Sequence, residues 1–138
     1  MNENDSFRKF QFTTHQIKSY LNNAFRDLRI AKESSIKEVK FSFSYNALLK
    51  SGIALISGVK GMKVRSVPGH HIAILKTMSE ILKDDSIFAV GNAMRMKRNT
   101  DLYSGGIFIS EKETNDYYNF VEETFKKIKN ILSTKRQK

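Results

Sequence analysis

The chain has 138 residues and a formal net charge of +10 at pH 7, from 24 Lys and Arg against 14 Asp and Glu. This length suits one domain with a real core, so we expect a single domain over 1–138, with about 12 residues at the start and 5 at the end mobile. The absence of cysteine excludes disulfides, zinc–thiolate sites and thiol catalysis. The surplus of positive charge favours an acidic partner, of which nucleic acid is the commonest.

The sequence carries no sign of a membrane or export segment. Residues Met1–Asp5 are polar and lack the apolar core of a signal peptide. Apolar runs such as Ile72–Leu75 are far shorter than the roughly 20 residues that span a bilayer. We therefore expect no membrane association and a cytoplasmic location.

The first predicted helix covers about residues 15–33 and is capped by Thr13-Thr14. Its apolar residues recur at steps of three and four and form one stripe: Ile17, Leu21, Ala24, Leu28 and Ala31.

The second segment is ambiguous, because Val39–Tyr45 alternates between apolar and polar residues as a strand does. No turn signal separates it from the apolar residues that follow, and a helical spacing continues to Gly61, a typical C-terminal stop. We therefore predict a long helix over 36–59, capped by Ser34-Ser35.

After a loop at 60–69, three further helices are predicted. One runs from His70 to about Lys83, and one starts at the Asp84–Ser86 cap and ends near Tyr103, before Gly105-Gly106. Ile107–Ile109 is an extended link to the last helix. That helix opens with a capping box, Ser110 and Glu113, and its buried stripe is Tyr117, Val121, Phe125, Ile128 and Leu132. The predicted fold is all-α, an antiparallel bundle of about five helices.

The most informative segment is Arg95–Tyr103, near the end of the fourth predicted helix. Arg95, Asn99 and Tyr103 are spaced by four and share a helix face, with Arg98 beside them. Arginine suits phosphate because its planar fork donates two parallel hydrogen bonds and stays charged. The simpler interpretation is a solvated helix face with Tyr103 packed against the next helix.

This segment, together with Gly69-His70-His71, resembles the HEPN superfamily. More specifically, it is similar to uncharacterised prokaryotic HEPN proteins with a Gly-His-His segment and an Arg-Asn-x-x-x-Tyr segment. The resemblance covers about residues 36–132. It implies a small helical bundle that pairs with a second copy and forms a cleft at the interface.

In active HEPN ribonucleases, an Arg-x(4–6)-His motif in that cleft cuts RNA without metal, through attack of the 2′-hydroxyl on the adjacent phosphate. Arg98 matches the arginine of the motif and Asn99 its polar follower. Tyr103 stands where the histidine is expected, and with a pKa near 10 a tyrosine is a poor base at neutral pH. The family also pairs with nucleotidyltransferases that modify a tyrosine near the arginine, which makes Tyr103 a candidate acceptor.

His70 and His71 are the candidates to replace the missing histidine, since imidazole titrates near neutrality. They follow Gly69 at a predicted helix start, where amide groups and the helix dipole favour an anion. If the third and fourth helices run antiparallel, this start lies near the Tyr103 end. The alternative is that the two histidines only cap and pack.

Further basic residues, Arg95, Lys97, Lys63 and Arg65, are candidate nucleic-acid contacts. No His, Asp and Glu cluster has metal-ligand spacing and no phosphate-binding glycine loop is present, so we expect neither metal nor cofactor.

The preferred hypothesis is a HEPN-like homodimer of a toxin–antitoxin or defence system. It would bind RNA through an Arg98-centred cleft and could cut it as a metal-independent endoribonuclease, with Arg98, Asn99, Tyr103, His70 and His71 as catalytic candidates. One alternative is a non-catalytic module that binds a nucleotide, an antitoxin or a nucleotidyltransferase. Another is a purely structural helical adaptor.

Overall fold

The structure is a computed structural model that describes the backbone of residues 3–104 and 109–136, and the side chains of 5–100 and 109–134. Within these ranges the chain forms five α-helices, as predicted, which confirms the all-α fold class. They are α1 (Thr14–Glu33), α2 (Lys37–Lys60), α3 (His70–Leu82), α4 (Asp85–Ser104) and α5 (Glu111–Arg136). A short 3-10 helix, η1 (Glu3–Ser6), and two strands, β1 (Phe7–Lys9) and β2 (Met62–Val64), complete the described elements.

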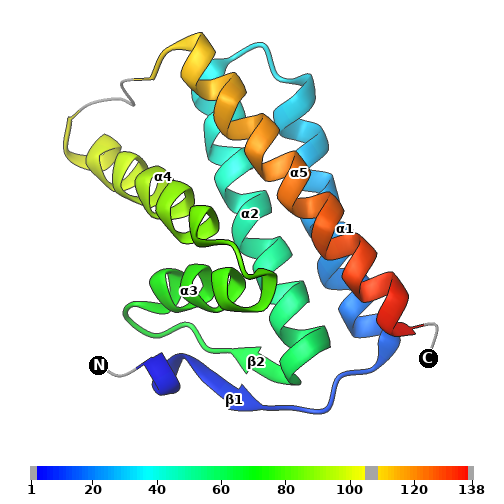
Figure 1. The fold of residues 1–138 in the computed structure, drawn as a ribbon. Helices are drawn as coiled ribbons and strands as arrows, with labels where there is room; N and C mark the ends of the chain where they lie inside the picture. Colours follow the sequence, from blue (N-terminus) through cyan, green and yellow to red (C-terminus); the bar gives the residue numbers. More distant parts are fainter. Residues whose placement is uncertain (1–2, 105–108, 137–138) are drawn as a thin grey trace.

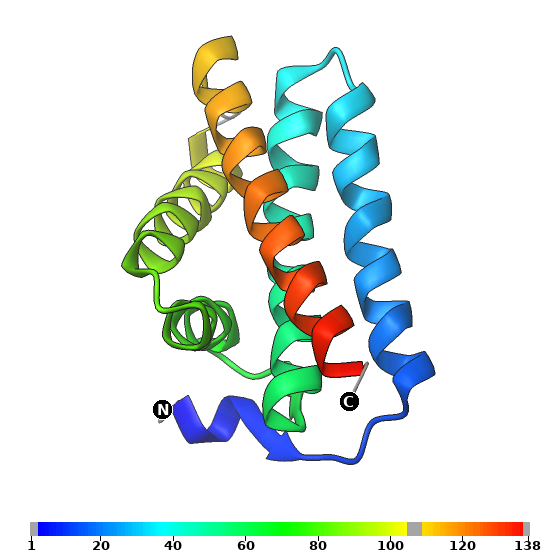
Figure 2. The same ribbon diagram turned by 45° about the vertical axis from the view of Figure 1, so that its right-hand side comes forward.

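Helix α2 is the centre of the molecule and packs against each of the other four helices. Figures 1 and 2 show α1, α2 and α5 side by side as three long helices, with α1 antiparallel to α2. Helices α3 and α4 lie on the other side of α2, and α3 crosses it rather than running alongside (Figure 2). The bundle is therefore made by the three long helices, while α3 and α4 form a separate pair against α2.

The amino-terminal end of α1 is fixed as its sequence predicts. Thr13 accepts a hydrogen bond from the Gln16 backbone N–H at 3.1 Å, and the Gln16 side chain accepts one from the Thr13 N–H at 2.8 Å. The predicted Ser34-Ser35 cap of the next helix is wrong. Ile36 occupies the N-cap of α2 with no side-chain capping hydrogen bond, and the Ser34 N–H donates to the Ile30 carbonyl at the end of α1.

The ambiguous segment at 39–45 is helical, because α2 is covered on nearly all sides and does not need a single apolar stripe. Phe41, Tyr45 and Leu48 are fully buried. A glycine lets α3 approach closely, since a Cβ on Gly52 would overlap the Met78 Sδ atom. The helix ends at Gly61, whose φ of 61° is a left-handed conformation that suits glycine.

A two-stranded antiparallel sheet ties the amino-terminal segment to the loop before α3. Phe7 pairs with Val64 and Lys9 with Met62, and the Arg65 N–H donates to the Ser6 carbonyl at 2.7 Å. Neither strand is predicted from the sequence. Their three-residue length is too short to show a clear alternation, and the pairing partner lies over 50 positions away.

The remaining helix starts follow the predicted caps. The Asp84 carboxylate accepts a hydrogen bond from the Ser86 N–H at 3.0 Å, and Ser110 and Glu113 form the reciprocal hydrogen bonds of the capping box. Ile109 is buried, while the rest of the predicted link, 107–108, lies outside the described residues. None of the described helices is both long enough and apolar enough to cross a lipid bilayer.

Candidate functional site

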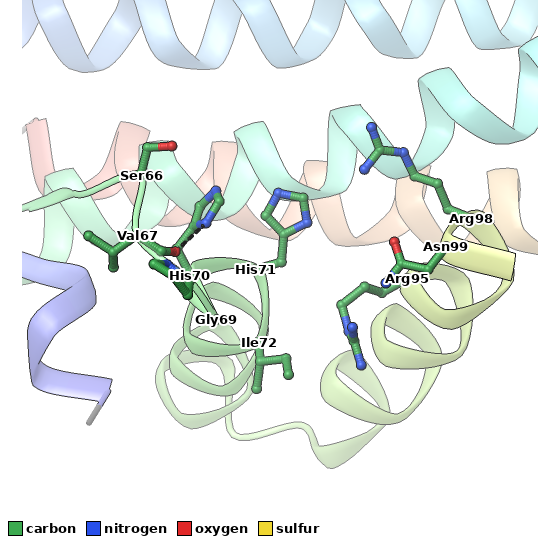
Figure 3. A pocket seen from close by; sticks show the side chains of 10 residues that line it. Ser66, Val67, Gly69, His70, His71, Ile72, Arg95, Arg98 and Asn99 are labelled. Atoms are coloured by element: carbon green, nitrogen blue, oxygen red, sulfur yellow. Dashed lines mark hydrogen bonds between the residues drawn. The ribbon is translucent and has the colours of Figure 1, made fainter. Parts of the chain in front are cut away.

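A cavity of about 440 Å³ lies between the start of α3 and the second half of α4. We call it the α3–α4 pocket. The loop before α3 supplies one wall, the first residues of α3 the floor, and α4 the opposite wall (Figure 3). Its lining residues are Ser66, Val67, Pro68, Gly69, His70, His71, Ile72, Arg95, Arg98 and Asn99.

The loop wall is shaped by Gly69, the N-cap of α3. Its φ of 83° lies in the left-handed region, which L side chains rarely adopt, so the turn into α3 requires glycine at this position. Apart from Gly69 and its neighbours in the chain, no described atom lies within 4 Å of the place where a Cβ would stand, so the requirement is conformational and not steric. The turn brings the Val67 carbonyl to 2.8 Å from Nδ1 of His70.

The His71 ring is held by a hydrogen bond with a buried tyrosine of α2. Its Nδ1 lies 3.0 Å from the hydroxyl of Tyr45, a residue with no exposed surface. The rings of His70 and His71 meet edge to face, with centroids 4.4 Å apart. Both imidazoles therefore line the pocket with Nδ1 held by protein groups.

The opposite wall carries two arginines with different surroundings. The Arg98 guanidinium carbon lies 5.5 Å from the centre of the Tyr45 ring, a cation–π arrangement. Figure 3 shows Arg98 extending toward α2 and Arg95 pointing the other way. The Arg95 Nε donates to the Asn92 side-chain oxygen at 3.0 Å. Arg98 is consequently the arginine that shares a partner, Tyr45, with His71.

The pocket environment favours neutral rings. Burial first, and then the nearby charges of His70, Arg98 and Arg95, lower the pKa of His71 from its ordinary 6.5 to about 4. Burial raises the pKa of Tyr45 to about 12, against the opposing effect of Arg98 and Arg95. At neutral pH, His71 is an uncharged imidazole and Tyr45 keeps its phenolic proton.

The structure brings five of the predicted site residues together in this pocket: His70, His71, Arg95, Arg98 and Asn99. The start of α3 does lie beside the second half of α4. Tyr103 lies in the last turn of α4, but its side chain is outside the described part of the chain.

Three predicted nucleic-acid contacts do not line the pocket. Lys97 Nζ lies 3.4 Å from the Glu113 carboxylate at the start of α5. Lys63 Nζ lies 5.2 Å from the centre of the Phe10 ring, and Arg65 donates to the Asp5 carbonyl at 3.1 Å. These three side chains contact other parts of the protein and are not among the residues that line the pocket.

Tyr45 is the site residue that sequence reasoning missed. It lies within the segment with strand-like alternation, and on a helix it falls among apolar core positions. A tyrosine there gives one weak signal, because a buried hydroxyl needs a hydrogen-bond partner. The sequence does not show which residue provides that partner.

Among the described residues, no group of three or more His, Cys, Asp or Glu side chains is placed to hold a metal ion. No family model, curated protein or solved structure matches the chain.

Proposed function

We propose that the α3–α4 pocket binds single-stranded RNA through its phosphate backbone, with Arg98 as the principal contact. The observation that carries this proposal is that Arg98 and Asn99 from α4 line one pocket with His70 and His71 at the start of α3, and Arg95 lines it as well. Arginine side chains, amide groups and a helix start all stabilise phosphate oxygens. The volume, about 440 Å³, lies within the range of small-ligand sites and suits one nucleotide unit of a chain that continues outside.

The overall charge supports the same proposal. The chain carries +10, which attracts polyanions and speeds their encounter with the protein. Within the pocket, the described lining residues include two arginines and no carboxylate. A negatively charged ligand is therefore favoured over a cationic or neutral one.

The test is the affinity for a fluorescently labelled oligouridylate at low salt. Arg98→Ala should weaken binding about tenfold or more, because a hydrogen-bonded charge pair is lost. Arg98→Lys should recover only part of this loss, since lysine lacks the bidentate fork. Arg29→Ala is the matched control, because Arg29 is an exposed arginine of α1, a helix on the opposite side of α2 from α3 and α4 (Figure 2). Equal affinities for the wild type, Arg98→Ala and Arg29→Ala would overturn the proposal.

Cleavage of the bound RNA is the second candidate function, favoured by the presence of two imidazoles beside Arg98. Metal-independent cleavage would yield a 2′,3′-cyclic phosphate in the presence of a chelator, and it would be lost in His70→Ala. Binding without any cleavage would leave the non-catalytic module as the function. A second copy of the chain, an antitoxin and a nucleotidyltransferase remain the partners that the HEPN resemblance predicts.

A further inference from the structure

The two adjacent histidines of the pocket have different partners for the same ring nitrogen. Nδ1 of His70 lies 2.8 Å from the Val67 carbonyl, which accepts hydrogen bonds and cannot donate. Nδ1 of His70 therefore carries a proton. In the neutral ring, Nε2 of His70 is then an unprotonated acceptor.

His71 presents the opposite case. Its Nδ1 lies 3.0 Å from the Tyr45 hydroxyl, and within the described chain no other group hydrogen bonds that hydroxyl. Tyr45 is fully buried, and leaving its phenolic proton without an acceptor would cost about 1–3 kcal/mol. The phenol consequently donates to Nδ1, and the neutral His71 ring carries its proton on Nε2.

We propose that Val67 and Tyr45 hold His70 and His71 in opposite tautomers, so that the pocket recognises a ribonucleotide by its 2′-hydroxyl and adjacent phosphate together. Nε2 of His70 accepts the hydrogen bond of the hydroxyl, and the N–H at Nε2 of His71 donates to a phosphate oxygen. Tyr45 is a positioning residue that acts through His71. This inference rests on the proposed function, and it names the groups that distinguish RNA from DNA.

The geometry agrees with this pair of contacts. The ring centroids lie 4.4 Å apart, with the rings at 71° to each other, so adjacent groups of one nucleotide can contact both rings. Arg98 and His71 share Tyr45 as a neighbour, so the phosphate-binding groups lie on the same side of His70. Deoxyribose lacks the hydroxyl and leaves Nε2 of His70 without its ligand partner.

The tautomers are tested directly by nitrogen-15 NMR of labelled imidazoles at neutral pH, without any ligand. We expect His70 to be protonated on Nδ1 and His71 on Nε2. In Tyr45→Phe, the His71 signals should move toward a mixture of tautomers while those of His70 stay in place. The same tautomer in both rings, or a His71 signal unchanged in Tyr45→Phe, would overturn the assignment.

Recognition is tested with labelled oligouridylate and oligodeoxyuridylate, which differ only in the 2′-hydroxyl. His70→Asn keeps an amide near the Nδ1 position for Val67 but has no group at Nε2. It should lower RNA affinity about fivefold, leave DNA affinity unchanged and abolish the preference for RNA. His71→Asn should weaken both ligands about tenfold, whereas His71→Gln, whose amide reaches the Nε2 position, should restore most of the binding.

The outcomes separate this inference from the proposed function. Arg98-dependent binding with equal affinity for RNA and DNA would overturn the inference alone. If the wild type binds neither oligonucleotide, the proposed function and this inference are both overturned. The tautomers seen by NMR would then belong to a pocket for another ligand.

Discussion

The two sides of α2 are built differently. Toward α1 and α5, α2 presents close apolar contacts, such as Phe41 against the Tyr117 ring and Gly58 beneath Leu132. Toward α3 and α4, the equally buried Tyr45 ends in a hydroxyl that holds His71 and presents its ring face to Arg98. The side facing α1 and α5 therefore contributes mainly stability, whereas the side facing α3 and α4 combines close packing, as at Gly52, with a hydroxyl that positions polar groups in a cavity. Two substitutions and a change of pH should separate these contributions.

The largest effect on stability is expected on the α5 side. Phe41→Ala removes a fully buried ring and should lower the free energy of unfolding by about 3–5 kcal/mol, because the packed surroundings cannot close the cavity. Urea denaturation followed by circular dichroism measures this loss. The folded fraction should keep the wild-type affinity for oligouridylate. A loss of affinity in the folded fraction would show that the two sides of α2 are coupled.

A smaller effect is expected on the pocket side. Tyr45→Phe keeps the ring but removes the hydroxyl that serves His71 Nδ1, and it should cost about 1–3 kcal/mol of unfolding free energy. Unlike Phe41→Ala, it should also change the pocket, seen as weaker oligouridylate binding. A stability loss with unaltered binding would assign Tyr45 to the core alone.

The effect that is smallest at neutral pH is a dependence of stability on pH. The pKa of His71 is about 4 in the folded protein and near 6.5 when unfolded, so between these values the unfolded chain binds the extra proton. His71 therefore stabilises the fold above pH 6.5, and this contribution is lost as the pH falls toward 4. Denaturation midpoints across that window should fall less steeply in His71→Gln. Parallel curves for the two proteins would contradict the lowered pKa.

The starts of α1, α4 and α5 could be predicted because they carry explicit side-chain caps at Thr13, Asp84 and Ser110, whereas α2 and α3 begin without one. Arg98, Asn99, His70 and His71 were also predicted to share one site. The directions of the other basic side chains could not be predicted. Lys97 and Arg98 are neighbours in sequence but about 100° apart on a helix, and only the packing of α5 shows that Lys97 meets Glu113.

The hydrogen-bond partners of His70 and His71 could not be predicted from the sequence either. Tyr45 lies 26 positions before His71, and its partner depends on how α3 crosses α2. The β1–β2 pairing, which supports the loop carrying Val67, joins two short segments with no distinctive composition. Local patterns thus predict helices and the polar faces they carry, while the pairing of side chains depends on the angles between helices.

The hydrogen bond from His70 to the main chain of Val67 has a consequence for how such a site tolerates variation. Every amino acid has a carbonyl, so the identity of residue 67 is free to drift while the tautomer of His70 is preserved. Selection would act instead on Gly69, whose backbone angle sets the path of the loop. A pocket of this kind can keep the same protonated ring nitrogen while residue 67 changes. The arrangement therefore cannot be recognised from a pattern of residue types.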